Sequence, residues 1–255
     1  MEPLLRIQDL SKYYGTPSNL TKALDKVSFQ AQTGEFIGVM GASGSGKTTL
    51  LRCISTLDHI TSGHIFLDGQ DITRLSQKDV ARFRRENLGF IFQDYNLLDT
   101  LTLGENIRLA LTIQGEDEKK IDEKTKEMAR RLNIHQILDK FPPQVSGGQM
   151  QRCACARAMV NKPKLLLADE PTGALDSRSG AELMAAFNEL NELYHITIFM
   201  VSHDAFAASH CHRILFLKDG QIFHELIRGG RSRRDFFQDI LDVMSGLGGD
   251  VAYVR

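Results

Sequence analysis

Residues 41–49 read Gly41-Ala42-Ser43-Gly44-Ser45-Gly46-Lys47-Thr48-Thr49, and this stretch decides the fold. A strand-like run, residues 35–40, leads into it, and an apolar run at helical spacing, residues 50–54, follows it. The stretch satisfies the pattern G-x-x-x-x-G-K-[ST] in the strand–loop–helix context that the pattern requires. A glycine-rich turn with a chance lysine is the competing interpretation, but the loop, the lysine, the hydroxyl and the flanking periodicities all agree. We therefore expect all nine residues, the phosphate loop, to bind a nucleoside triphosphate.

The chemistry of this loop follows from its residue types. Glycines let successive backbone N–H groups point at phosphate oxygens, and the helix that follows adds its free N-terminal N–H groups. Lys47 is expected to reach the β- and γ-phosphates, and the Thr48 hydroxyl is expected to ligate Mg²⁺.

Composition excludes several classes of protein. With 31 basic and 32 acidic residues among 255, the net charge of −1 gives no general attraction to nucleic acid. The opening Met-Glu-Pro does not resemble a secretory signal, and no apolar run approaches the roughly 18–20 residues of a membrane span. A membrane role is therefore expected to come through a partner. The cysteines are too scattered for a zinc site and are predicted to be buried thiols in a reducing cytosol: Cys53, Cys153, Cys155 and Cys211.

Apolar runs alternate with helical segments after the phosphate loop, which predicts a largely parallel sheet covered on both faces. Strands are expected at 4–10, 23–29, 62–69, 88–93, 165–170 and 196–201, with a hairpin at 214–223. Helical segments are expected at 77–86, from 102, at 117–132, 134–140, 150–160 and 179–193.

Two carboxylates end one of the apolar strands. Leu165 to Ala168 precede Asp169 and Glu170. Beside a phosphate loop, such a strand end predicts that the first carboxylate holds Mg²⁺ and that the second polarises the attacking water.

A second anion-binding pattern opens the helix at 150–160. Ser146-Gly147-Gly148-Gln149 offers a hydroxyl, exposed N–H groups and a helix N-terminus. Taken alone, this pattern would favour an ordinary helix cap.

Together these motifs resemble the nucleotide-binding subunits of ABC transporters, in the order of that family and over essentially the whole chain. Val145 to Gln149 is similar to the family's signature motif, with Val in place of the usual Leu. Further positions match its Q-loop (Gln93), D-loop (Ala174-Leu175-Asp176), switch histidine (His203) and adenine-stacking aromatic (Tyr14). Because Tyr13 is adjacent, one of the two tyrosines is expected to be in the core, and the spacing favours Tyr14 as the stacking residue.

The resemblance implies an α/β fold: a RecA-like P-loop ATPase core with an antiparallel β flap and an inserted α-helical subdomain. The expected division is 1–93 (flap and first part of the core), 94–156 (helical subdomain with the signature), 157–226 (second part of the core) and 227–255 (C-terminal extension).

It also implies the roles of the site residues, with ATP and Mg²⁺ as cofactors. Lys47 would neutralise phosphate charge, Glu170 would be the general base, and His203 would hold the γ-phosphate and the water. Thr48, Asp169 and Gln93 would organise Mg²⁺ and the attacking water. Ser146 to Gln149 would contact the phosphate loop of a second copy of the chain in a head-to-tail dimer, and Asp176 is expected among the nucleotide-binding residues.

Two segments are very similar to the bacitracin-export type of antimicrobial-peptide resistance transporters, namely 90–102 and the tail from 218 to 240. That subgroup implies a permease partner, a place at the cytoplasmic face of the membrane, and often a sensor histidine kinase. An ATPase subunit of a non-transporting membrane complex, of the lipoprotein-release or cell-division type, stays open as the alternative. A soluble ATPase acting on nucleic acid or ribosomes is disfavoured, because the chain has neither a second cassette nor a long coiled coil.

The tail has two interpretations of its own. Arg228, Arg231, Arg233 and Arg234 beside Phe236-Phe237 could form a helix packed on the core, or a docking surface for the permease or lipid. The first is favoured. Residues 161–164, which superficially suggest a guanine-reading motif, lack the final Asp and are interpreted as a turn.

Overall fold

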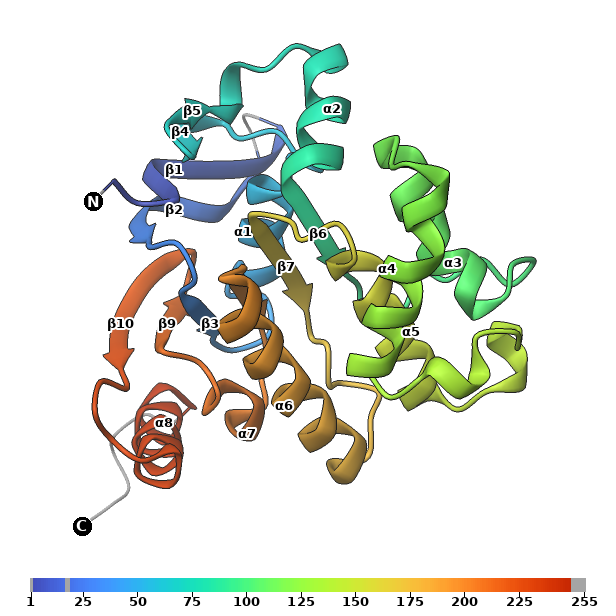
Figure 1. The fold of residues 1–255 in the computed structure, drawn as a ribbon. Coiled ribbons are helices and arrows are strands. Elements are labelled where there is room, and N and C mark those ends of the chain that lie inside the picture. The colour runs from blue at the N-terminus through green and yellow to red at the C-terminus, as the bar shows by residue number, and fades with distance from the viewer. Residues whose placement is uncertain (1, 17–18, 249–255) are drawn as a thin grey trace.

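A sheet of short strands, most of them buried, forms the centre of the molecule (Figure 1). The structure is a computed structural model that describes residues 2–16 and 19–248. The central strands span Phe36–Met40 (β3), Leu88–Ile91 (β6), Leu165–Asp169 (β7), Thr197–Val201 (β8), Arg213–Lys218 (β9) and Gln221–Ile227 (β10). Within the described ranges their order is β10-β9-β3-β8-β7-β6, and all neighbours are parallel except β9 and β10. The predicted parallel sheet is confirmed.

A second, antiparallel sheet forms the predicted flap. It contains β1 (Leu5–Thr16), β2 (Asn19–Ala31), β4 (Ser62–Leu67) and β5 (Gln70–Asp71). The first two strands are longer than predicted, because the ladder continues through pairs such as Tyr14 with Thr21 and Thr16 with Asn19. These exposed residues carry no apolar alternation that would mark them as strand. The sequence also predicts a turn at 16–19, whose residues Pro17 and Ser18 lie outside the described residues.

Helices cover both sheets. They span Lys47–Ile54 (α1), Gln77–Asn87 (α2), Leu103–Gln114 (α3), Glu118–Arg131 (α4), Gly147–Met159 (α5), Ser177–Tyr194 (α6), Ala205–Ala208 (α7) and Arg233–Gly248 (α8). Capping boxes begin α3, with Thr102 and Glu105, and α5, with Ser146 and Gln149. In each, the two side chains satisfy N–H groups that a helix start leaves without partners.

The prediction of a helical segment at 134–140 is wrong. It contains only a single 3₁₀ turn, His135–Ile137, and a second turn, Pro142–Gln144, follows. Prolines at 142 and 143 lack the N–H donors that a longer helix needs. The carbonyls of Leu138 and Lys140 instead accept hydrogen bonds of 2.8 Å each from the first N–H groups of α3. The tertiary contact therefore overrides the local pattern. A third 3₁₀ turn, Ile72–Arg74, follows β5.

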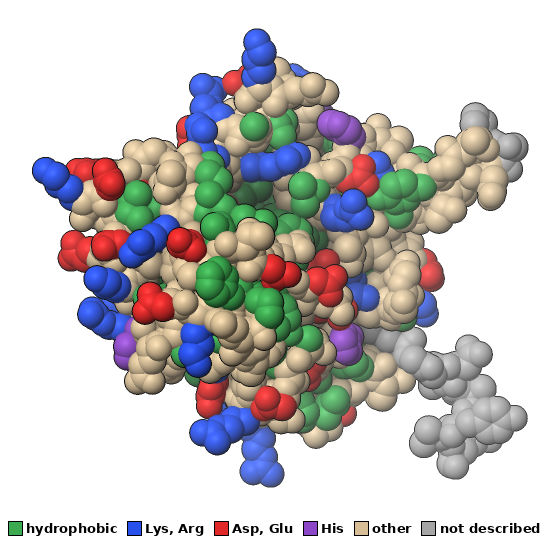
Figure 2. All heavy atoms as spheres, turned by 90° about the vertical axis from the view of Figure 1, so that its right-hand side faces the viewer, with side chains coloured by type: hydrophobic (Ala, Val, Ile, Leu, Met, Phe, Trp, Pro, Cys, Tyr) green, Lys and Arg blue, Asp and Glu red, His purple; other side chains and the backbone are tan. Residues whose placement is uncertain are grey.

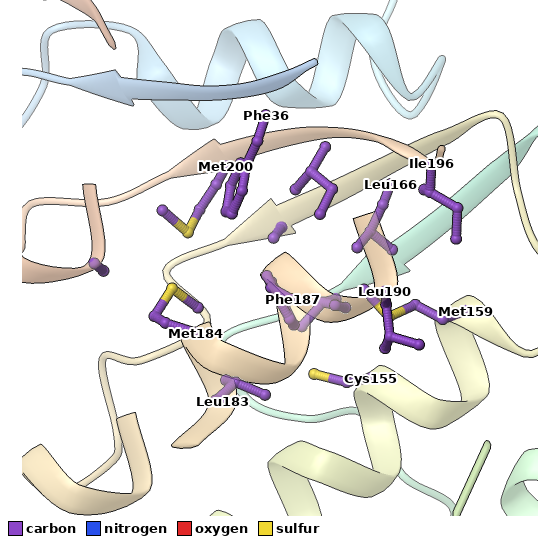
Figure 3. Packing of buried hydrophobic residues seen from close by; sticks show 14 of the residues in the cluster. Phe36, Cys155, Met159, Leu166, Leu183, Met184, Phe187, Leu190, Ile196 and Met200 are labelled. Carbon is purple, nitrogen blue, oxygen red and sulfur yellow. The ribbon is translucent and has the colours of Figure 1, made fainter. Parts of the chain in front are cut away.

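Two buried clusters lie on opposite faces of the central sheet. Leu166 and Ala168 of β7 belong to one cluster, and Leu165 and Leu167 belong to the other. Figure 3 shows how strand residues of the first cluster face Phe187 and Leu190 of α6. The second cluster joins the sheet to α1 and the flap, where the rings of Phe29 and Phe199 stack at 5.7 Å. Burying each such side chain contributes roughly 1.5–3 kcal/mol.

The helical insertion lies to one side of the central sheet, where α3, α4 and α5 gather (Figure 1). Leu103, Ile107 and Met128 join the first cluster and thereby fasten the insertion to the core. Residue 94 follows β6 closely and residue 156 lies within α5, so neither predicted boundary coincides with a break between elements, and both stay predictions.

All four cysteines are buried and free, as predicted. Burial raises the pKa of the Cys53 and Cys153 thiols to about 12 and also raises the pKa of Cys155 and Cys211. As to membrane spans, within residues 2–16 and 19–248 none of the helices combines the length and the apolar character that a crossing requires.

The C-terminal helix packs on the core, which confirms the favoured interpretation of the tail. Phe236 and Ile240 of α8 are fully buried in the first cluster. An Arg233 guanidinium nitrogen lies 3.1 Å from Nε2 of the buried His210. Burial, together with the charges of Arg233 and Arg228, lowers the pKa of His210 to about 4, so the ring is neutral and its Nε2 accepts this hydrogen bond.

Replacing Phe236 with Ala tests this packing. The change should lower the free energy of unfolding by about 3–5 kcal/mol, because it leaves a cavity beneath α8. Urea denaturation measures it, with Arg234→Ala, an exposed position on the same helix, as the control. Equal stability of the two variants would show that α8 does not contribute to the core.

Candidate active site

The phosphate loop joins β3 to α1 and forms one wall of a cavity of about 490 Å³. Gly46 stands at the N-cap of α1 and offers no side chain to the first turn, so the N–H groups of that turn stay available for an anion. The cavity is lined by Thr21, Lys22, Ala23, Gly41, Ser43, Gly44, Gly46, Lys47, Thr48, Thr49, Glu170 and His203. Its volume is in the range of small-molecule sites.

Glycine is required at two positions of the loop by close backbone contacts. A Cβ on Gly41 would lie 2.2 Å from the carbonyl oxygen of Leu217, and one on Gly46 would lie 2.4 Å from that of Ala23. Gly44 differs, since a Cβ on it would meet nothing within 4 Å, although its φ is also positive at +79°. Gly44 therefore faces open space, while the other two hold the loop against its neighbours.

Lys47 is buried beneath the loop. Its Nζ donates hydrogen bonds to the carbonyls of Gly41, at 2.9 Å, and Ala42, at 2.8 Å. Burial lowers its pKa, while the charges of Glu170 and Asp169 oppose that shift. The Lys47 ammonium group is thus held by the backbone of the phosphate loop.

Two residues of the phosphate loop, Ala42 and Ser45, do not line the cavity with their side chains. The Ser45 hydroxyl is buried behind the loop and has no hydrogen-bond partner among the described residues, and Ala42 is exposed outside the cavity lining. The backbone of Ser45 is tied down, because its carbonyl accepts a 3.1 Å hydrogen bond from Gly220 in the β9–β10 turn.

Two carboxylates follow each other at the end of β7, and the second of them, Glu170, lines the cavity. Asp169 hydrogen-bonds the Thr48 side chain, and its pKa is raised by burial and by the charge of Glu170. Glu170 has a left-handed backbone, with φ of 46°, held by a 2.9 Å hydrogen bond from its N–H to the Val201 carbonyl. Its Oε1 lies 3.1 Å from Nδ1 of His203. A non-glycine residue in this conformation is strained, and such strain is typical of functional sites.

Tyr14 lies at the edge of this cavity. Its side chain is 41% exposed and hydrogen-bonds Thr49, which lines the cavity. The adjacent Tyr13 is only half-buried and hydrogen-bonds Asp25, so the expectation of a core tyrosine was wrong. The reason is that strand pairing places Tyr13 opposite Lys22, near the exposed end of the β1–β2 ladder where Thr16 pairs with Asn19.

Gln93 is exposed, two residues beyond the end of β6. Because β6 and β7 are parallel neighbours, it emerges at the same sheet edge as the carboxylates. The chain then passes through left-handed Tyr95 and Asn96, whose carbonyls accept hydrogen bonds of 3.0 and 2.5 Å from Arg157 of α5. The segment after Gln93 is thus attached to α5.

The predicted signature forms the start of α5, away from the cavity. The Ser146 hydroxyl accepts a 3.3 Å hydrogen bond from the Gln149 N–H, and Gly148 lies beside Ser179 of α6. Asp176 caps that second helix through the Ser179 N–H, at 2.9 Å. Among the described residues that line the cavity, none belongs to 145–149 or to the Asp176 cap. Two helix N-termini therefore lie side by side on a separate surface.

Three lining residues were not predicted. Thr21, Lys22 and Ala23 enter the cavity from β2, because Gly46 packs against the Ala23 carbonyl. No motif marks them, and only the pairing of the flap hairpin with the loop could have indicated them.

Comparison with known proteins decides what kind of site this is. The ABC transporter family model matches residues 24–173. The chain belongs to the ABC transporter family. It is an ATP-binding subunit and an ATPase, and its fold is the RecA-like core predicted from the sequence.

Individual relatives agree with this assignment. The chain is 48% identical over 246 residues to the bacitracin export ATP-binding protein BceA of Halalkalibacterium halodurans, covering 96% of this chain and 97% of that one. It is 40% identical to the macrolide export ATP-binding/permease protein MacB of Vibrio parahaemolyticus, covering 88% of this chain and 34% of that one. Among structures, the dimeric ATP-binding cassette MJ0796 with bound ADP and Pi matches with a TM-score of 0.82 and 35% identity, covering 89% of this chain and 99% of that one. The resemblance to bacitracin-export ABC proteins is confirmed.

The two kinds of glycine in the loop give a matched pair of variants. Gly44→Ala should cost only the strain of a left-handed alanine, about 1–2 kcal/mol. Gly46→Ala should cost roughly 2–5 kcal/mol, because a Cβ that collides with the Ala23 carbonyl is added to that strain. Urea unfolding without nucleotide measures both, and equal losses would contradict the steric account.

Proposed function

We propose that this ATPase drives a membrane permease that exports antimicrobial peptides of the bacitracin class and so protects the cell. The observation that carries the ATPase chemistry is the convergence of Lys47, Glu170 and His203 on one cavity. The peptide class is supported by the similarity to BceA over nearly the whole chain. A place at the cytoplasmic face of the membrane and a link to a sensor histidine kinase through the permease belong to the same proposal.

In this proposal ATP lies along the phosphate loop, with its adenine on Tyr14. The loop supplies backbone N–H groups, and Lys47 leaves the carbonyls of Gly41 and Ala42 to pair with the β- and γ-phosphates. Support comes from the sequence of contacts: Thr48 and Thr49 line the cavity, and Thr49 bonds Tyr14.

Glu170 is the proposed general base for the attacking water. Its contact with His203, at 3.1 Å, keeps the two side chains on the same side of the γ-phosphate position. His203 would orient the phosphate and the water, and Gln93 would approach from the end of β6.

The donor set fits Mg²⁺. Thr48 and Asp169 present oxygen atoms close enough to hydrogen-bond each other, and oxygen is the ligand that Mg²⁺ prefers. Burial beside Glu170 disfavours the charge on Asp169, a penalty that a cation relieves. Thr48, Asp169 and Gln93 would hold the ion, which when bound neutralises phosphate charge.

A second copy of the chain completes the site in this proposal. Ser146 to Gln149 present a glycine-rich helix N-terminus that is absent from the lining of their own cavity. A head-to-tail pair would bring this N-terminus and Asp176 against the phosphate loop of the other chain. The dimeric cassette MJ0796, 35% identical, supports this arrangement.

The permease has a suitable surface to dock on. A groove of about 400 Å³ lies between β6, α3 and α5, and is lined by Arg85, Leu88, Gly89, Phe90, Phe92, Asn96, Ala110, Ile113, Arg157, Ala158 and Asn161. Figure 2 views the molecule from the side of the helical insertion and shows hydrophobic side chains gathered at the centre, with basic ones nearby. A short amphipathic helix of the permease would fit such a groove. MacB, whose name joins an ATP-binding part to a permease, supports this partnership.

Glu170→Gln tests the proposed chemistry. ATP hydrolysis should fall at least about 100-fold, because the amide cannot accept the proton of the attacking water. Binding of ATP should persist, and light scattering should show a dimer at saturating Mg-ATP. Glu123→Gln makes the same chemical change on the exposed face of α4 and should behave as the unchanged protein. Full turnover by Glu170→Gln would refute the role of base, and a protein that stays monomeric would count against the shared site.

Ile113→Asp tests the docking groove. This side chain is 57% exposed, so a carboxylate is tolerated by the fold but opposes an apolar partner. In cells that depend on this chain for bacitracin resistance, the variant should lower resistance by a larger factor than it lowers the ATPase rate of the purified protein. Leu193→Asp, on a side chain that is 47% exposed on α6, is the control. Equal resistance in the two strains would exclude this groove as the permease site.

A further inference from the structure

The side chain of Tyr14 is held in one orientation by two neighbours that no motif includes. Its hydroxyl donates a hydrogen bond to Oδ2 of Asp58 at 2.5 Å. The Nζ of Lys12 donates to the other carboxylate oxygen, Oδ1, at 2.7 Å, and to the His59 carbonyl at 2.7 Å. Both oxygens of the carboxylate are therefore used, and each fixes one partner.

Lys12 and Asp58, which with Tyr14 form a cluster near the surface, are largely shielded from solvent. The side chain of Lys12 is 11% exposed and that of Asp58 is 22% exposed. Although burial opposes the charge on Asp58, hydrogen bonds from Lys12 and Tyr14 keep its pKa below the usual value. The carboxylate is thus ionised at neutral pH and stays a strong acceptor.

The same lysine covers one face of the tyrosine ring. The Nζ of Lys12 lies 4.6 Å from the ring centroid, within the range of cation–π attraction. Since Tyr14 remains 41% exposed, the ring presents its other side to solvent beside the nucleotide cavity. One face is occupied and the other is available to a flat ligand.

The cluster is also joined to the helix that carries the phosphate loop. Asp58 lies just beyond the end of α1, and its N–H donates a 3.1 Å hydrogen bond to the Arg52 carbonyl of that helix. The N-terminus of α1 holds the phosphate loop, so a single rigid element sets the separation between the phosphates and the ring.

We propose that Asp58 and Lys12 are positioning residues of the nucleotide site, which fix the Tyr14 ring as the surface on which the adenine base stacks. The inference rests on the proposed stacking role of Tyr14. An exposed tyrosine near the turn end of a hairpin would otherwise lose rotational freedom when the base binds, and this loss would weaken affinity. With the hydroxyl and one face already held, the ring is ordered before the nucleotide arrives.

Paired affinity measurements test this proposal. ATP and inorganic tripolyphosphate are titrated without Mg²⁺ into the full chain by calorimetry. Asp58→Asn and Tyr14→Phe should each weaken ATP binding about threefold to tenfold and leave tripolyphosphate binding unchanged, because only the base subsite is disturbed. Tyr14→Phe retains the Lys12–Asp58 pair, so it keeps the test valid if Asp58→Asn folds poorly. The double variant should bind ATP with no lower affinity than the single variant that binds it less tightly, because the two substitutions remove the same restraint on the ring.

The control is Asp68→Asn, which removes the carboxylate of another lysine–aspartate pair, with Lys164 at 2.6 Å, outside the cavity. It should bind both ligands as the unchanged protein does. Tyr14→Ala measures the stacking role itself and should weaken ATP binding at least about fivefold.

The outcomes distinguish a failure of the positioning role of Asp58 from a failure of the stacking role of Tyr14. If Tyr14→Ala weakens ATP binding while Asp58→Asn and Tyr14→Phe do not, positioning by Asp58 is refuted and stacking stands. If Tyr14→Ala binds ATP normally, the stacking role fails and the inference fails with it. If ATP and tripolyphosphate affinities fall together, the cluster supports the fold of the loop rather than the base, which also overturns the proposal.

Discussion

Close backbone contact on both sides of the phosphate loop is the constraint on which the rest of the structure depends. Gly41 packs against the Leu217 carbonyl of β9 in the central sheet, and Gly46 packs against the Ala23 carbonyl of β2 in the flap. The loop is thus held between the two sheets, and its curvature is set by both. Any side chain at either glycine would push a sheet away, because protein interiors have little room to adjust. The position of the flap, and with it that of Tyr14, follows from this contact.

A second set of contacts joins the sheet edge to the helical insertion. Arg157 is largely withdrawn from water, and burial lowers its pKa. Among the described residues it has no carboxylate partner, and its guanidinium is satisfied by the carbonyls of Tyr95 and Asn96. A Cβ on Gly147, the first residue of α5, would lie only 2.9 Å from the Tyr95 hydroxyl. The segment after Gln93 therefore packs closely against the start of α5 and is hydrogen-bonded to Arg157 near its end.

Much of the fold could be predicted from the sequence because its signals are local. The buried strands read as apolar runs, and Thr102 and Ser146 begin helices with capping boxes that are visible as S/T-x-x-E/Q patterns. The residues that line the cavity from β2 could not be predicted, since a contact between sheets leaves no periodic pattern. Residues 134–140 were mistaken for a helix because the carbonyls of Leu138 and Lys140 accept hydrogen bonds from another helix, α3. The separation of Ser146 from the cavity was expected only from the family resemblance, because no spacing along the chain indicates it.

The turn between β9 and β10 gains a further meaning from its position. Gly220 donates its N–H to the Ser45 carbonyl, and its own carbonyl accepts from Asp25, at 3.1 and 2.9 Å. With φ of +77° and the Ala23 carbonyl 2.9 Å from where a Cβ would stand, it has as little freedom as the loop itself. Hairpin tips usually vary freely between relatives and accept insertions, so protein engineers choose them for tags and fusions. The β9–β10 turn is a poor choice, because an insertion at its tip would disturb the phosphate loop that it contacts.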